Sequence, residues 1–112
     1  MKNILQQYLR RANHTTWQPV PAEKLASGTA EDQMLLLNVN TGEYFGLNAV
    51  GALIWELADG TRTVATIAQE VSDEYETVEL GRVQKDTAKL ARELVEQELA
   101  ELSAQPSPVQ GT

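Results

Sequence analysis

The sequence contains no cysteine, a single histidine and a single phenylalanine among its 112 residues. A chain without cysteine has no disulfide, no zinc–thiolate site and no thiol nucleophile. The one histidine, His14, cannot form a metal site that needs several imidazoles. The sequence also shows no nucleophile–base pair and no phosphate-binding loop. We therefore predict a protein that has no catalytic residues, no metal and no cofactor, and that is not an enzyme.

Long hydrophobic runs are also missing. No apolar run approaches the ~20 residues that cross a membrane, and the first residues lack the apolar region of a signal peptide. We therefore expect a cytoplasmic protein without membrane contact. Hydrophobic residues make up 42% of the chain, which is enough for the core of one small domain.

Positive charge is scarce as well. Nine Lys and Arg residues stand against sixteen Asp and Glu residues, which gives a net charge of −7. An acidic surface repels phosphate, so we do not expect nucleic acid as a partner. The charge is unevenly spread, because residues 1–22 hold Lys2, Arg10 and Arg11 and no acid, whereas the rest holds six basic and sixteen acidic residues, or −10. An N-terminal arm of this charge would be attracted to the acidic body or to a partner.

The N-terminal part of the chain carries only short structural signals. Residues 3–12 place apolar side chains at helical spacing and predict a short helix. Residues 15–21 contain two prolines, which break helices, so this stretch predicts an extended linker. Residues 25–30 predict a strand, and residues 30–33 predict a turn.

The middle of the chain predicts a hairpin followed at once by a helix. Residues 34–39 and 43–47 have strand character, and Asn40-Thr41-Gly42 between them supplies residues that tolerate a positive φ. Asn48 then stands where a helix N-cap is expected, before an apolar stripe at i, i+3, i+4 and i+7, and Gly60 is placed as the C′ residue of that helix.

Two further helices follow. Thr63 is placed to cap a helix from Val64 to about Tyr75, and the apolar pattern from Leu80 to Leu102 predicts a third helix. Three short strands followed by three helices predict an α+β fold of the winged helix-turn-helix class, with a small three-stranded antiparallel sheet. We accordingly expect an N-terminal arm over 1–22, a domain over 23–103 and a disordered tail over 104–112.

Several spaced residues of the hairpin and its helix carry a family resemblance. Residues 25–102 resemble the pyrroloquinoline-quinone biosynthesis protein D (PqqD) family, also called RiPP recognition elements, and the sharpest matches are Thr41-Gly42, Tyr44-Phe45, Leu47-Asn48, Gly51 and Ile54-Trp55. The family usually closes its third helix with Gly-Leu, where this chain has Glu98-Leu99. Because Glu propagates a helix that Gly would end, we expect the third helix to continue to about Ser103.

The resemblance implies a function in peptide binding. Members of the family bind the leader of a ribosomally made precursor peptide as an additional strand and present it to a separate modifying enzyme, such as a radical SAM enzyme or a leader peptidase. The partners implied here are therefore a precursor leader peptide and such an enzyme, with the protein itself as a monomer or weak dimer. The product class stays open: a quinone cofactor, a lasso peptide or a crosslinked peptide.

The resemblance also implies where the leader binds, namely the edge of the last strand and the facing side of the third helix. By strand alternation we expect Phe45 in the core and Tyr44 in the more exposed position. Carried over by position, the peptide-binding residues are Glu43, Tyr44, Phe45, Gly46, Leu47, Arg82, Val83, Asp86, Lys89, Leu90 and Glu93.

Two alternatives stay open at this level. A winged helix could instead bind DNA or act as a protein-interaction regulator, although residues 80–102 carry four basic and five acidic side chains, unlike a basic recognition helix. In addition, residues 1–16 could occupy the groove of their own domain, or of a neighbour, as an inhibitor or a dimer arm.

Overall fold

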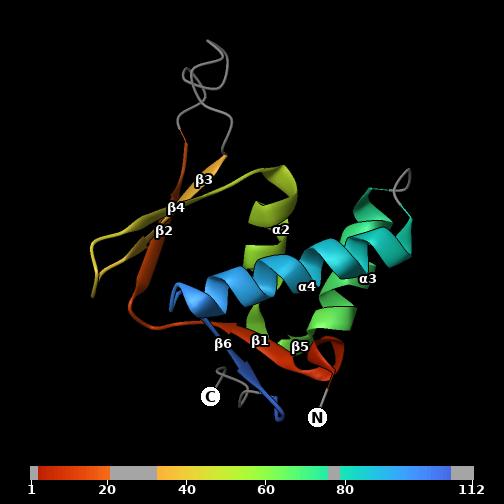
Figure 1. The fold of residues 1–112 in the computed structure, drawn as a ribbon. Coiled ribbons are helices and arrows are strands. Elements are labelled where there is room, and N and C mark those ends of the chain that lie inside the picture. Colours follow the sequence, from red (N-terminus) through yellow and green to blue (C-terminus); the bar gives the residue numbers. More distant parts are fainter. Residues whose placement is uncertain (1–2, 21–32, 76–78, 107–112) are drawn as a thin grey trace, which may run out of the picture.

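The computed structural model describes residues 3–20, 33–75 and 79–106. Within these residues, two small antiparallel sheets pack against three α-helices (Figure 1). The predicted α+β winged helix-turn-helix class is confirmed. In chain order the elements are η1 (Ile4–Gln6), β1 (Tyr8–Arg11), β2 (Thr15–Pro19), β3 (Met34–Asn38), β4 (Tyr44–Leu47), α2 (Ala49–Leu57), β5 (Asp59–Thr63), α3 (Val64–Glu74), α4 (Leu80–Glu96) and β6 (Ala100–Ser103).

The first sheet has the strand order β2-β3-β4 and contains the predicted hairpin. Strand β3 pairs with β2 from Asn38 to Met34 on one side, and with β4 from Leu37 to Met34 on the other. Burial alternates along β3, with Met34, Leu36 and Asn38 buried, because one face of the sheet packs on the helices. The prediction of two strands at 34–39 and 43–47 is therefore confirmed. The observed β3 ends one residue earlier than predicted, and the observed β4 begins one residue later.

Local signals at the start of α2 are also confirmed. Gly42 has φ 80° in the hairpin turn, a backbone conformation that favours glycine. Asn48 is the N-cap of α2, and its Oδ1 accepts a hydrogen bond from the backbone N–H of Gly51 at 2.8 Å. A Cβ on Gly51 would lie 3.1 Å from Leu47 Cδ2, so this glycine lets the first turn of α2 pack closely against β4.

The end of α2 differs from the prediction. The helix ends at Leu57 with Ala58 as C-cap, so Gly60 is not its C′ residue. Gly60 instead lies inside β5 with φ 87°. Thr63 ends that strand and caps α3 as predicted, accepting a hydrogen bond from the N–H of Thr66 at 3.1 Å.

The predicted helix over 3–12 is wrong. Only η1 is helical there, and the following residues form β1, the central strand of a second sheet with the order β5-β1-β6. The apolar residues suit either structure, but ten residues make a marginal helix, whereas β5 and β6 offer hydrogen-bonding partners on both sides. Leu9, which is fully buried at the centre of β1, adds hydrophobic stabilisation to that pairing.

The predicted linker over 15–21 is wrong in its role, although its extended backbone is confirmed over residues 15–19. Thr15–Pro19 form β2, which pairs with β3 over its whole length. Pro19 is tolerated because the bonds of the flanking residues, including Val20 N–H to Gln33 O at 2.9 Å, turn its own nitrogen away from β3. The strand predicted at 25–30 and the turn at 30–33 fall at or beyond the boundary of the described residues.

The predicted continuation of the third helix to Ser103 is also wrong. Helix α4 ends at Glu96, Gln97 is its C-cap, and Glu98 has φ 58° before the chain enters β6. A left-handed non-glycine residue costs about 1–2 kcal/mol. Burial of Leu99 and Ala100, at 2% and 3% exposure, and the pairing of β6 with β1 outweigh that cost.

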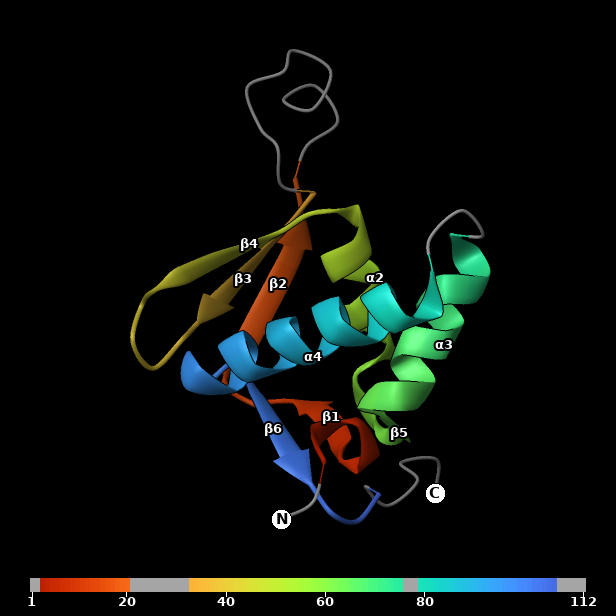
Figure 2. The same ribbon diagram turned by 45° about the vertical axis from the view of Figure 1, so that its right-hand side comes forward.

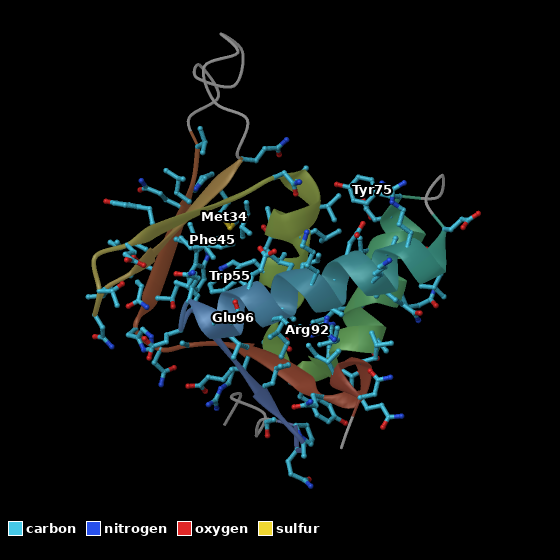
Figure 3. All side chains as sticks on the ribbon, in the orientation of Figure 1. Met34, Phe45, Trp55, Tyr75, Arg92 and Glu96 are labelled. Carbon is cyan, nitrogen blue, oxygen red and sulfur yellow. The ribbon has the colours of Figure 1, made fainter. Side chains whose placement is uncertain are left out.

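The core lies where both sheets and the three helices meet. Figure 2 shows α4 running across the middle of the molecule, between β2-β3-β4 on one side and α3 on the other. Trp55 of α2 is fully buried at the centre, and Figure 3 places it between the hairpin and α4. Helix α3 packs along α4, and both bury one face. None of the helices in the described segments is long and apolar enough to cross a membrane.

Candidate functional site

Strand β4 lies at the edge of its sheet, with β3 on one side and no strand on the other among the described residues. Asn38 N–H donates to Glu43 O at 3.0 Å, which fixes the alternation of the β3–β4 ladder. In that alternation Phe45 faces Leu36 in a hydrogen-bonded pair, while Tyr44 and Gly46 occupy non-hydrogen-bonded positions. The N–H and C=O groups of Tyr44 and Gly46 therefore point away from β3, toward the free edge.

A groove of about 460 Å³ runs along this edge, between β4, the first half of α2 and one side of α4. We call it the β4–α4 groove. Its floor is apolar and its α4 rim is charged, which suits an extended peptide with alternating apolar and polar side chains. The residues that line it are Phe45, Gly46, Leu47, Asn48, Val50, Gly51, Ile54, Asp86, Lys89, Leu90 and Glu93.

The α4 side of the groove follows from helical periodicity. Asp86, Lys89, Leu90 and Glu93 recur at three- and four-residue intervals and share one face of the helix. Ala91 and Leu94, which lie on the side of α4 turned toward the core, are fully buried. The groove-lining face thus offers one half-buried apolar side chain, Leu90, between charged groups of both signs.

Most of the predicted site residues are brought together by the fold. Those that line the groove are Phe45, Gly46, Leu47, Asp86, Lys89, Leu90 and Glu93. Phe45 packs against the core and Tyr44 is 68% exposed, as expected from strand alternation. Tyr44 therefore contributes its backbone to the free edge, while its side chain lies over the outer face of the sheet beside Leu35 and Leu37.

Besides Tyr44, three predicted residues lie outside the groove lining. Glu43 belongs to the hairpin turn, and its C=O accepts a hydrogen bond from the backbone N–H of Asn38. Arg82 and Val83 line a neighbouring pocket of about 300 Å³ with Tyr75, the C-cap residue of α3. The groove and this pocket share Val50 and Asp86 in their linings. The pocket therefore adjoins the groove at the end that lies nearest the N-terminus of α4. Arg82 Nε lies 3.9 Å from Asp86 Oδ2, an exposed ion pair at this junction.

Sequence reasoning missed the contribution of α2. Asn48, Val50, Gly51 and Ile54 line the groove, although the sequence assigns them to a helix cap, close packing and the core. The sequence signal for this contribution was the i, i+4 spacing of Val50 and Ile54. That spacing shows that the two side chains share one face of the helix, but it does not show which element packs against that face. Only the approach of β4 to α2 through Gly51 turns this face toward the groove.

The N-terminal residues do not fill the groove of their own domain. Residues 8–11 pair with β5 and β6, and residues 15–19 pair with β3 on the side opposite β4. The hypothesis that residues 1–16 occupy the groove of the same chain is therefore wrong for residues 3–16. Among the described residues, no three His, Asp or Glu side chains gather as a metal site.

Comparison with known proteins places this geometry in context. The model of the family described as "Coenzyme PQQ synthesis protein D (PqqD)" matches residues 33–100. The solved structure of TbiB1 in complex with the TbiA(beta) leader peptide is 28% identical, with a TM-score of 0.65, and the match covers 82% of this chain and 94% of that chain. Lasso peptide synthetase B1 complexed with the leader peptide is also 28% identical, with a TM-score of 0.64, covering 83% and 96%. No curated protein matches the chain.

Proposed function

The chain belongs to the PqqD family, and from this premise we propose that it binds the leader of a ribosomally synthesised precursor peptide on the free edge of β4. The bound leader extends the sheet by one strand and lies in the β4–α4 groove. The observation that carries this proposal is the position of the N–H and C=O groups of Tyr44 and Gly46, which face no other strand among the described residues, beside an apolar groove. Such an edge offers affinity through the main chain and selectivity through the groove.

The groove suggests which leader side chains are selected. In an added strand, alternate side chains point to the same face. Those that enter the groove meet Leu47, Ile54 and Leu90, so they are apolar. Lys89 on the rim is placed to pair with a leader carboxylate, and Asp86 or Glu93 with a leader Lys or Arg. These rim pairs tune register and association rate more than affinity.

The protein acts without catalysis of its own in this proposal. It holds the leader while the core of the precursor enters a separate modifying enzyme, which raises the effective concentration of substrate at that enzyme. The two similar structures are of TbiB1 and of a lasso peptide synthetase B1, both with leader peptide bound. This favours a precursor of the lasso-peptide class.

The decisive experiment changes one backbone N–H at the free edge. Gly46→Pro removes the outward N–H of Gly46 without touching the ladder to β3, since that group points away from β3. Gly46→Ala is the matched control, because it keeps the N–H. Leu47 is unsuitable for this purpose, since it is 2% exposed and belongs to the core.

The measurement is fluorescence anisotropy with a labelled synthetic leader of the precursor encoded beside the gene for this chain. We expect Gly46→Pro to weaken binding at least tenfold, or about 1.4 kcal/mol, and Gly46→Ala to change it less than threefold. Far-UV circular dichroism checks that both variants keep their helices. If Gly46→Pro binds as tightly as the wild type, strand addition is wrong. If the wild-type protein does not bind the peptide, leader recognition itself is wrong.

A further inference from the structure

The C-terminal end of α4 is attached to the hairpin sheet by side-chain hydrogen bonds. Asn38 Nδ2 donates to Gln97 O at 3.1 Å, and His14 Nε2 lies 2.6 Å from Glu98 O. Thr15 Oγ1 adds a bond to Leu99 O at 3.2 Å. The carbonyl groups that leave the helix therefore find donors on β2, on β3 and in the turn before β2, instead of in the next helical turn.

Asn38 also closes the turn that leads into β4. Its Oδ1 accepts hydrogen bonds from the backbone N–H of Asn40 at 3.0 Å and of Thr41 at 3.2 Å. The side chain is 2% exposed, so its bonds are shielded from water. One buried amide thus joins the turn that leads into β4 to Gln97, the C-cap residue of α4.

These two elements are the facing walls of the β4–α4 groove. A groove that admits a peptide strand leaves its walls unable to pack on each other along its length. Helix α2 joins the two walls at the floor of the groove, so attachments at the ends of the groove are what further fix their separation. Glu93, which lines the groove, lies one helical turn before Gln97, and β4 begins directly after the turn that Asn38 closes.

We propose that Asn38 is a positioning residue that sets the separation of β4 and α4, so that the groove is preorganised for a leader strand. The proposal rests on the proposed function and deepens it, since Asn38 does not line the groove. Preorganisation raises affinity because the protein loses less conformational entropy when the peptide binds. His14 supports the same attachment from the residues just before β2.

The test replaces Asn38 by aspartate. Asn38→Asp has almost the same shape and keeps an oxygen toward the N–H groups of Asn40 and Thr41, but it directs a second oxygen at Gln97 O, where the amide donated. Thr41→Ala is the matched control, because it removes the bond from Glu43 N–H to Thr41 Oγ1 at 3.2 Å in the same turn and leaves the attachment to α4 intact.

Two readouts are compared, each on the full chain. Hydrogen exchange is followed at the amides of Gln97, Glu98 and Leu99, which bond back to the last turn of α4. Affinity is measured with the synthetic leader used above. In Asn38→Asp we expect at least tenfold faster exchange at these amides and at least fivefold weaker peptide binding, whereas Thr41→Ala stays within twofold on both.

Unfolding by urea separates positioning from general stability. A purely structural role for Asn38 predicts that the two variants lose affinity in proportion to their loss of stability, and that result overturns the proposal. Unchanged affinity of Asn38→Asp despite faster exchange also overturns it. If Asn38→Asp does not fold, His14→Ala replaces it, with a loss of affinity of about threefold expected and no loss counting against the proposal. The exchange measurement needs no peptide, so failure of the wild type to bind leader is distinguishable from failure of the attachment.

Discussion

The indole rings of Trp17 and Trp55 form a T-shaped pair, with centroids 5.4 Å apart and planes at 79°. Trp17 comes from β2 and is 44% exposed, whereas Trp55 of α2 is fully buried. The guanidinium of Arg11 lies 5.2 Å from the Trp17 ring centroid and donates to Trp55 O at 2.7 Å. Residues from the N-terminal strands are thereby held against the helix at the centre of the core.

This contact predicts a stability effect that is separate from binding. Trp17→Ala removes the aromatic pair, which is worth ~0.5–1.5 kcal/mol beyond area burial, and the cation–π contact with Arg11, worth ~0.5–1 kcal/mol. We expect a loss of about 2 kcal/mol in the free energy of unfolding, measured by urea denaturation. Trp17→Phe keeps an aromatic ring at this position, so it should lose less stability than Trp17→Ala.

Leader affinity should not change in folded Trp17→Ala, because β2 lies on the side of the sheet opposite β4. A variant that unfolds like the wild type would show that the Trp17–Trp55 contact contributes nothing to stability. A variant that is stable but fails to bind leader would place the binding site elsewhere.

The left-handed residue after α4 predicts a stabilising substitution. Glu98 is exposed and has φ 58°. Glycine adopts this conformation without the steric cost, although it loses more entropy on folding, so Glu98→Gly should stabilise the protein by about 0.5–1 kcal/mol. Thermal unfolding followed by circular dichroism measures this. Glu96→Gly, inside the last helical turn, is the control and should destabilise by a similar amount. Equal melting temperatures for Glu98→Gly and the wild type would contradict the expectation.

Asp59 at the start of β5 predicts an acid-sensitive contribution to stability. Burial raises the pKa of its carboxyl, but hydrogen bonds from the Thr61 side chain and N–H, together with Arg62, outweigh burial and lower the pKa below 3.8. A group whose pKa is lowered by folding stabilises the protein above its unfolded pKa and loses this contribution as pH falls through the folded pKa.

We therefore expect the wild type to exceed Asp59→Asn in stability by a constant amount at pH 5 and above, and the difference to shrink below about pH 4. The side chain is 38% exposed, so solvent screening keeps the difference below about 1 kcal/mol. Urea denaturation of both proteins between pH 3 and 6 measures it. A difference independent of pH would show that the carboxylate charge has no role.

The sequence predicts the part of the fold that rests on contacts between near neighbours. The Asn48 and Thr63 caps each accept a hydrogen bond from an N–H three residues on, and Gly42 adopts a positive φ within a five-residue connection. The Phe45 and Tyr44 orientations follow from strand alternation alone. These features depend on residue type and spacing, which a single sequence displays.

Tertiary structure decided what depends on distant partners. Residues 8–11 became a strand because β5 and β6 flank them, and the chain left α4 at Glu96 because Leu99 and Ala100 could be buried beside β1. Likewise, Val50 and Ile54 line the groove only because β4 and α4 converge on α2. The sequence by itself determined the hairpin, the helix starts and the family. Tertiary structure decided the second sheet, the end of α4 and the walls of the groove. These features depend on pairing and burial between segments far apart in the chain, and a local sequence pattern does not contain the free energy of such contacts.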